Sequence, residues 1–297
     1  MDAILHWGVN IIVTIQQIHG PVTDSIFRVI TFLGEVEFFL ILLPLIFWCV
    51  DSRLGAHFAI LYLFSNYIHI GLKDLLQQPR PSDIDSRVLQ LSHAEGYGLP
   101  SGHTQSATVV LGSIAAQLRS TWFWVIAIGI IFLVGFSRIY LGVHFPTDVL
   151  AGWIIGIVLV IIYLKLHTNI EKWLVKQRLG MHMLLGLGVP LVLLIAHPVK
   201  ESADAMGTLA GLGVGIAFLQ RYSYFSAGGP WWQRALRFVI GIAVILGLYF
   251  GLKVALPGGE SALYLVFRFL RYSLIGVWVT FGAPWLFRLL KLVYRPK

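Results

Sequence analysis

Charged residues are scarce in this chain of 297 residues. They make up 12% of the sequence, whereas hydrophobic residues make up 57% and the mean hydropathy is +0.79. So little polar material cannot cover the surface of a soluble globule. The composition therefore excludes a soluble enzyme or binding module and indicates an integral membrane protein.

Cysteine is nearly absent as well, with Cys49 as its single instance. One cysteine cannot form an intramolecular disulfide, and it makes a cysteine-based metal cluster implausible. The sequence also lacks an internal repeat of fixed period and a low-complexity linker. We therefore expect one compact helical membrane domain rather than an array of repeats.

Long apolar runs, in contrast, fill most of the chain. Each is about 15 to 21 residues long, close to the length that a helix needs to cross the hydrocarbon core. They fall near residues 36–50, 54–73, 101–118, 121–141, 147–166, 181–197, 206–220, 236–256 and 272–290. This pattern predicts an all-α polytopic membrane protein, a bundle of about eight or nine transmembrane helices.

The first 34 residues do not fit this pattern. The run Ile4–Ile18 is short for a span and ends with the polar residues Gln16, Gln17 and His19. An amphipathic helix lying in the membrane interface is the preferred interpretation. A removable signal peptide is not expected, because the segment lacks a basic n-region followed by a small-residue cleavage site.

The net charge of +8 could suggest a nucleic-acid partner, but the positions of the charges favour a membrane topology. Loops on one side of the expected bundle hold thirteen cations against the acids Asp51 and Glu171. By the positive-inside rule that side is cytoplasmic, and no nucleic-acid partner is expected. The other side then faces the periplasm or exterior, most simply of a bacterial inner (plasma) membrane. The thirteen cations are Arg53, Arg119, Lys165, Lys172, Lys176, Arg178, Arg221, Arg234, Arg237, Arg288, Lys291, Arg295 and Lys297.

Three polar clusters lie at the outward ends of neighbouring spans. They are Lys73 with Arg80 and Pro81, then Pro100-Ser101-Gly102-His103, then Ser137 and Arg138 followed by His144 and Asp148. Singly, each has a structural explanation: membrane-edge cations, a plain helix start, and a hydrogen bond tying a loop to a helix. Their joint occurrence on one side of the membrane is much harder to attribute to chance and favours a functional site.

The second cluster has the character of a helix start that binds an anion. Pro100 suits the first helical position, because it has no N–H to leave unsatisfied. Ser101, Gly102 and His103 would then occupy the first turn, where free N–H groups and the helix dipole attract negative charge. Gly102 would also let a phosphate oxygen approach the backbone.

Phosphoryl transfer is the chemistry that needs such a set of residues, since it depends on positioning and on fixed positive charge. Lys73, Arg80 and Arg138 could supply that charge, together with N–H groups near Ser101 and Gly102. In the third cluster Pro146 can begin a helix, so that Asp148 reaches back to His144. An imidazole aligned in this way is a good nucleophile towards phosphorus, and His103 is placed to protonate the leaving alkoxide.

The order Lys-x6-Arg-Pro, Pro-Ser-Gly-His and Ser-Arg-x5-His-x3-Asp resembles the signature of the type 2 phosphatidic acid phosphatase superfamily. The match is complete at every defining position and covers roughly residues 35–167. The resemblance implies a metal-independent lipid phosphatase that forms a phosphohistidine at His144 and uses no cofactor. The catalytic residues would be His144, His103 and Asp148, and the phosphate would be bound by Lys73, Arg80, Ser101, Gly102 and Arg138.

The resemblance divides the chain into four expected regions. In order they are an N-terminal interfacial segment at 1–34, a catalytic core at 35–167, a basic cytoplasmic loop at 168–180 and an accessory transmembrane region at 181–297. Many bacterial members resemble a six-span unit, so the four further spans set this chain apart. Its layout is similar to that of the eukaryotic sphingosine-phosphate phosphatases. Arg268 and Arg271 are expected to reach the outer interface, an interpretation preferred over a second lipid-phosphate site.

The expected partners are a membrane lipid substrate and the bilayer itself. Polyprenyl diphosphate, phosphatidic acid, phosphatidylglycerol phosphate and a long-chain-base phosphate all fit, and hydrolysis at the outer face is the main hypothesis. The alternatives are a phosphotransferase that uses an alcohol acceptor, a non-catalytic binder or translocator of lipid phosphates, and an enzyme for a soluble phosphate ester. Sequence leaves the lipid and the oligomeric state open.

Overall fold

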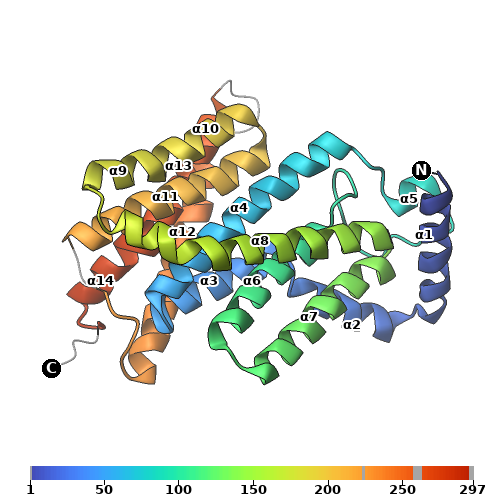
Figure 1. The fold of residues 1–297 in the computed structure, drawn as a ribbon, viewed down its shortest axis with the longest axis horizontal. Coiled ribbons are helices and arrows are strands. Elements are labelled where there is room, and N and C mark those ends of the chain that lie inside the picture. The colour runs from blue at the N-terminus through green and yellow to red at the C-terminus, as the bar shows by residue number, and fades with distance from the viewer. Residues whose placement is uncertain (1, 223–224, 257–262, 294–297) are drawn as a thin grey trace. The chain divides into compact units, whose positions relative to one another are not determined.

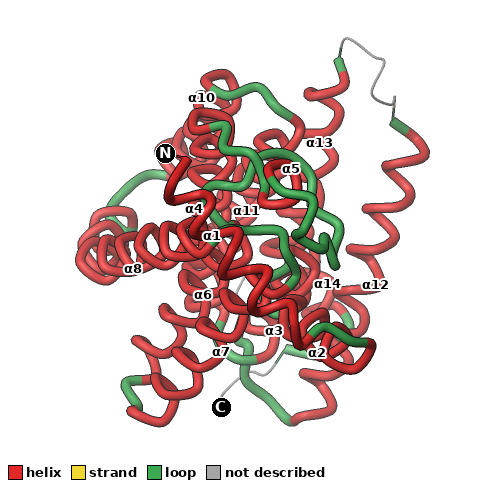
Figure 2. The backbone as a smooth tube through the Cα atoms, turned by 90° about the vertical axis from the view of Figure 1, so that its right-hand side faces the viewer, coloured by secondary structure: helices red, strands yellow, loops and turns green. Residues whose placement is uncertain are grey.

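The computed structural model describes residues 2–222, 225–256 and 263–293, and in these ranges every regular element is a helix (Figures 1 and 2). The all-α fold class is therefore confirmed. Helices suit a membrane, because each backbone N–H and C=O finds its partner within the same segment. Arg295 and Lys297, two of the expected cytoplasmic cations, lie outside the described residues.

Fourteen α-helical segments, one 3₁₀ turn and two π-helical turns make up the described chain. In order they are α1 (Asp2–Ile15), η1 (Gln16–Ile18), α2 (Pro21–Phe32), α3 (Val36–Cys49), α4 (Ser52–Leu76), α5 (Pro81–Ile84), α6 (Gly102–Leu118), α7 (Thr121–Tyr140), α8 (Pro146–Leu174), α9 (Leu179–Met183), η2 (Leu184–Gly188), α10 (Val189–Ala196), α11 (Lys200–Tyr222), α12 (Trp231–Ala255), α13 (Tyr264–Val277), η3 (Trp278–Gly282) and α14 (Ala283–Leu289).

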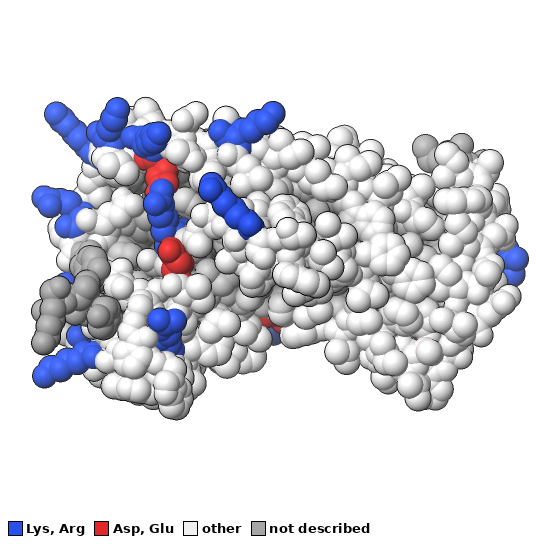
Figure 3. Space-filling model, turned by 60° about the horizontal axis from the view of Figure 1, so that its bottom comes forward, with Lys and Arg blue, Asp and Glu red and all other residues white. Residues whose placement is uncertain are grey.

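Among the described residues, six helical segments are long and apolar enough to cross a membrane: Thr121–Tyr140, Pro146–Leu174, Leu179–Ala196, Lys200–Tyr222, Trp231–Ala255 and Tyr264–Leu289. The pair α2 and α3, bent by 45° at their junction, would make a seventh. α4 and α6 coincide with two more expected runs, but α4 includes Lys73 and Asp74, and α6 has 17 residues. The count of eight or nine spans therefore stays a prediction. The face drawn in Figure 3 has large areas without charged side chains, as lipid contact requires.

The chain packs as two compact units rather than the single domain expected. The first holds the described parts of Met1–Phe39 and Ile68–Leu166, and the second those of Leu40–Tyr67 and His167–Lys297. Packing thus assigns residues 40–67 to the unit that contains the C-terminal helices. All residues of the three clusters belong to the first unit, which carries the candidate site as a whole.

In the first unit, two glycines of α8 allow close packing against α6. A Cβ atom on Gly152 would lie 2.7 Å from the carbonyl oxygen of Ser101, and one on Gly156 would lie 2.6 Å from Thr108 Cβ. Small residues four apart are the usual means by which membrane helices approach closely. The start of α6 is therefore held against the start of α8. α7 packs on α6 and on α2.

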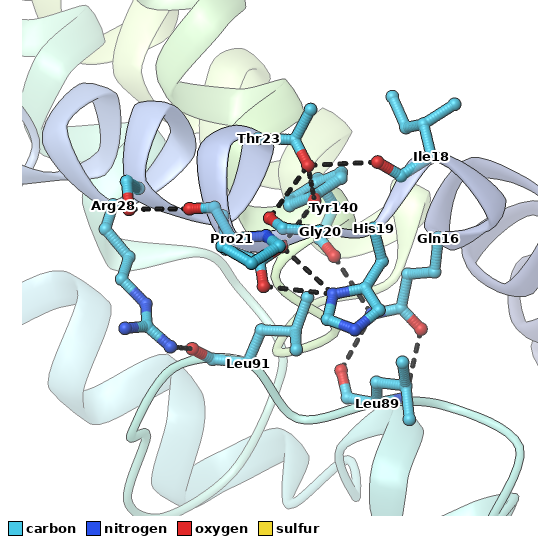
Figure 4. Close-up of polar contacts among 12 residues, drawn as sticks. Gln16, Ile18, His19, Gly20, Pro21, Thr23, Arg28, Leu89, Leu91 and Tyr140 are labelled. Atoms are coloured by element: carbon cyan, nitrogen blue, oxygen red, sulfur yellow. Dashed lines mark hydrogen bonds and ion pairs between the residues drawn. The ribbon is translucent and has the colours of Figure 1, made fainter.

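The N-terminal helices are packed against the rest of the first unit. Val9 and Ile12 of α1 form a buried cluster with Phe145, the residue after His144. The side-chain amide of Gln16 donates to the carbonyls of Leu89 at 2.7 Å and Tyr140 at 2.9 Å, as Figure 4 illustrates. A helix is thus present at Ile4–Ile18 as expected, and its place in the membrane interface stays a prediction.

The same close-up shows a second connection, made by α2. Arg28 donates to the carbonyl of Leu91 at 3.0 Å, and the hydroxyl oxygen of Tyr140 lies 3.0 Å from Thr23 Oγ1 (Figure 4). Tyr140 donates its one hydroxyl proton to Asp24 Oδ1 at 2.5 Å. These bonds fix the N-terminal segment beside the loop that holds His144.

In the second unit, α11 and α13 make the closest helix pair. A Cβ atom on Gly207 of α11 would lie 3.1 Å from Phe269 Cα, so these backbones nearly touch. Asp204 of α11 forms a two-point ion pair with Arg268 of α13, one of whose bonds, from Nη2 to Oδ2, is 2.6 Å long. Arg268 thus has a carboxylate partner that the sequence pattern did not predict, and Arg271 lies over the ring of Tyr272 at 5.0 Å. The interfacial position expected for both arginines stays a prediction.

Candidate active site

The loop that follows α4 is organised by Arg80. This guanidinium is 5% exposed, and it donates from Nε to the carbonyl of Gly96 at 2.8 Å, from Nη1 to Val143 at 2.7 Å and from Nη2 to Glu95 at 2.7 Å. Three of its five N–H groups are therefore bonded to backbone, and two remain for a phosphate. Arg80 thus holds the loop at 95–96 and the loop before α8 together.

The helix start at α6 lies later than expected. The first helical residue is Gly102 and not Pro100, and Ser101 is the N-cap. The N–H of Ser101 donates to the carbonyl of Asp148 at 3.0 Å, and its hydroxyl pairs with Thr104 Oγ1 at 2.9 Å. These bonds fix the position of Ser101, and the phosphate contact expected for it stays a prediction. The first-turn N–H groups of Gly102 and His103 have no partner within the helix, so they are donors that could bind an anion.

His144 and Asp148 meet as expected. α8 begins at Pro146, and His144 Nδ1 lies 3.3 Å from Asp148 Oδ2, which also accepts the N–H of Phe145 at 2.9 Å. The other carboxylate oxygen accepts from Gln78 Nε2 at 2.6 Å. Asp148 is fully buried and both of its oxygens are bonded, so the carboxylate has a fixed orientation. It favours the tautomer of His144 that carries its proton on Nδ1 and leaves the Nε2 lone pair free.

Electrostatics keeps His144 neutral. The residue lies in the loop between α7 and α8 and is 2% exposed. Burial, and after it the positive charges of Arg138, Arg80 and Lys73, lower the pKa of His144 well below its usual value. A neutral imidazole with a free Nε2 is the form that can attack phosphorus. The same three cations would attract the phosphate that it attacks.

Arg138 is bonded to protein less completely than Arg80. It lies in the last turn of α7 and is 2% exposed. Nη1 donates to Thr31 Oγ1 at 2.7 Å, and Nε is buried without a hydrogen-bond partner among the described residues. A buried N–H without a partner is costly unless a ligand accepts it. Arg138 is therefore the arginine better placed to bind an anion.

The sequence motifs did not identify two residues that lie near His103 in the structure. The carboxylate of Glu35, at the break between α2 and α3, lies 3.8 Å from His103 Nε2. His69, one turn before Lys73 on α4, has both ring nitrogens buried without a partner among the described residues. Its ring is so close to Gly102 that a Cβ atom there would lie 2.6 Å from His69 Nε2. Neither residue is part of the three motifs, so spacing gave no signal for them.

The first unit thus brings together two imidazoles, a carboxylate and three cations, most of them buried. Ser137 is fully buried and bonds to the carbonyl of Val134 in its own helix at 2.6 Å, so its role is structural. Within the described residues, no three His, Cys, Asp or Glu side chains converge in a way that could hold a metal ion.

Fold and site together define a polytopic helical membrane protein with a cluster of cations, two histidines and a carboxylate. A family model described as the PAP2 superfamily matches residues 54–172. A second model, the PAP2 superfamily phosphatase transmembrane extension, matches residues 203–295. The chain belongs to the PAP2 superfamily, the phosphatidic acid phosphatases that its three motifs resemble. The extension model lies within the expected accessory region at 181–297, and the division of the chain into a core and an accessory region stays a prediction.

Individual relatives agree with this membership. Lipid phosphate phosphatase delta of Arabidopsis thaliana is 28% identical over 239 residues, covering 73% of this chain and 57% of the relative. Sphingosine-1-phosphate phosphatase 1 of Rattus norvegicus is 26% identical over 197 residues, covering 62% and 46%. The chain thus spans about half the length of these two relatives. The crystal structure of a PAP2 type phosphatidylglycerolphosphate phosphatase from Bacillus subtilis matches with 27% identity and a TM-score of 0.52, over 57% of this chain and 89% of that one.

Proposed function

We propose that this protein hydrolyses a lipid phosphate monoester or diphosphate through a phosphohistidine at His144, without a metal ion, at the outer face of the membrane. The observation that supports the proposal most is the arrangement of His144. Its Nδ1 lies 3.3 Å from a fully buried Asp148, its pKa is low, and cations lie around it. A structural histidine would not need this combination of alignment, neutrality and surrounding positive charge.

The first chemical step forms the phosphohistidine. His144 Nε2 attacks phosphorus, the P–N bond forms, and the bond from phosphorus to the lipid oxygen breaks. His103 donates its proton to that oxygen, so that the lipid leaves as an alcohol, or as a monophosphate when the substrate is a diphosphate. Charge on the equatorial oxygens is neutralised by Arg138, Lys73 and the remaining donors of Arg80, and by the N–H groups that begin α6.

The second step returns the enzyme to its starting state. Water attacks phosphorus, the P–N bond breaks, and His144 leaves as a neutral imidazole. The proton of the water molecule passes to His103, which acts as a base and is ready to serve again as an acid. Inorganic phosphate is the second product. An alcohol in place of water would make the protein a phosphotransferase.

Long-chain-base phosphates lead the expected substrates, because one of the relatives above is named a sphingosine-1-phosphate phosphatase. Phosphatidylglycerol phosphate follows from the name of the Bacillus subtilis neighbour. Phosphatidic acid and polyprenyl diphosphate complete the panel. A site at the ends of membrane helices can receive a headgroup while the acyl or prenyl chain stays in the bilayer.

The test is phosphate release from each of these lipids by the purified protein in detergent with EDTA present. The expected result is turnover of at least one lipid, and loss of turnover in His144→Ala by at least roughly a thousandfold. Full turnover by His144→Ala would exclude the mechanism. Labelled phosphate that appears in a second lipid rather than in solution would identify a phosphotransferase, and binding without release would identify a non-catalytic protein.

A further inference from the structure

Glu35 is a carboxylate placed where a phosphate site would seem to need none. It occupies the break between α2 and α3, and its Oε1 lies 3.8 Å from His103 Nε2. The preceding residue, Gly34, lets this break approach the first turn of α6, because a Cβ atom there would lie 2.9 Å from His103 Cβ. A negative charge so near the phosphate would weaken substrate binding unless it served another purpose.

The charges around His103 suggest that purpose. To act as a general acid, His103 must carry a proton, yet its Nε2 is buried without a hydrogen-bond partner among the described residues. The groups that face it are Arg138 of α7, Lys73 and His69 of α4, and His144 of the loop before α8, with Arg80 acting on the same cluster. Burial and these cations favour the neutral imidazole. The carboxylate of Glu35 opposes them.

We propose that Glu35 is a positioning residue that keeps His103 protonated and directs it to the leaving oxygen. The inference rests on the proposed function, in which the His103 proton moves to the lipid oxygen as the P–O bond breaks. Glu35 itself transfers no proton and does not contact the phosphate. After the lipid has left, the same carboxylate stabilises the imidazolium that forms when His103 takes the proton of the attacking water.

The test compares two leaving groups. An alkyl phosphate, such as the preferred lipid of the panel, needs a proton on its departing oxygen, whereas p-nitrophenyl phosphate releases a stabilised phenolate that does not. Glu35→Gln is expected to lower kcat/KM for the lipid by about tenfold to a hundredfold, since general acid catalysis contributes on this scale. For p-nitrophenyl phosphate the expected change is within about threefold. Activity on the aryl substrate also shows that the variant is folded.

Three further measurements separate this role from a merely structural one. The basic limb of the pH profile for the lipid should move to lower pH in Glu35→Gln, and Glu35→Asp should restore part of the loss. In a His103→Gln background, Glu35→Gln should have little further effect, because the group on which it acts is gone. Glu37→Gln is the matched control, since Glu37 is an exposed glutamate in the first turn of α3.

Equal losses on both substrates, or a full additional loss in the His103→Gln background, would overturn the role of Glu35. That result leaves the proposed function standing, provided that the wild-type protein hydrolyses the lipid. Absence of phosphate release by the wild type from both substrates is a different outcome, and it would remove the proposed function and this inference together.

Discussion

At the scale of single residues, the two arginines of the site differ in what they hold. Arg80 donates to three backbone carbonyls that lie in two separate loops. Arg138 has one bond to Thr31 and a buried Nε without a partner among the described residues. Arg80 therefore acts mainly on the structure of the site, and Arg138 mainly on the ligand.

This difference predicts different effects of the same substitution. Arg80→Lys should lower the free energy of unfolding by about 2–4 kcal/mol, because a lysine cannot satisfy three carbonyls in a fixed fork. Arg138→Lys should leave stability within about 1 kcal/mol and reduce kcat/KM by at least about tenfold. Thermal unfolding in detergent and phosphate release measure the two effects. A large fall in Tm for Arg138→Lys with none for Arg80→Lys would contradict these assignments.

Contacts between residues close together in the sequence could be predicted, whereas contacts between residues far apart in the sequence could not. The contact between His144 and Asp148 spans four residues, so helix geometry alone predicted it, and the structure confirms it. Gln78 reaches Asp148 across 70 residues, and Glu35 approaches His103 across 68. Such contacts depend on how helices pack, which spacing does not encode.

At the scale of elements, the contact between α6 and α8 sets the geometry of catalysis. Ser101, at the start of α6, is bonded to the backbone of Asp148 in α8. Gly152 packs next to this bond, because a Cβ atom on Gly152 would lie 2.7 Å from the carbonyl oxygen of Ser101. The relative position of His103 and His144 therefore depends on Gly152, a residue outside the three motifs.

Gly152→Val should separate the two helices and lower kcat/KM by roughly a hundredfold, as expected for a displacement of about 1 Å in an active site. The substituted protein should still insert into the membrane, since valine is apolar. Gly129→Val in α7 is the matched control, because no atom lies within 4 Å of a Cβ atom placed on Gly129. If both variants keep wild-type activity, the close packing of α6 on α8 is not what aligns the histidines.

The elements themselves were easier to predict than their ends. Each expected apolar run coincides with a helical segment, because length and hydropathy dominate in a membrane. The start of α6 was predicted two residues early, since Ser101 is fixed by a bond to Asp148 that no local pattern reveals. The packing of α1 on Phe145 was missed for a similar reason.

At the scale of the whole molecule, the predicted topology places the site on the outer side of the membrane. The loop at 85–99 adjoins the site, whereas the basic residues after α8 are expected to be cytoplasmic. Cys49 is the sole cysteine of the sequence and is buried, so a Cys49→Ser background allows a single cysteine to be placed at either position. Ser86 and Lys176 are exposed residues suited to this purpose.

In intact cells, a maleimide that cannot cross membranes should label Ser86→Cys and not Lys176→Cys. After permeabilisation both should react. Labelling of Lys176→Cys alone in intact cells would place the site in the cytoplasm and would reverse the predicted topology, while leaving the chemistry of the site unchanged.

The proposed mechanism depends above all on a covalent phosphohistidine at His144, and trapping this intermediate is its sharpest test. Purified protein is mixed with lipid that carries labelled phosphate and is denatured within milliseconds under alkaline conditions that preserve phosphohistidine. The protein is then digested, and its peptides are sequenced by mass spectrometry. We expect label on the His144 peptide of the wild-type protein and no label in His144→Ala. When an aryl phosphate forms the intermediate, the label in His103→Ala should last longer, because the base that activates water is missing. Label on another residue, or phosphate release by His144→Ala at the wild-type rate, would contradict the proposed mechanism.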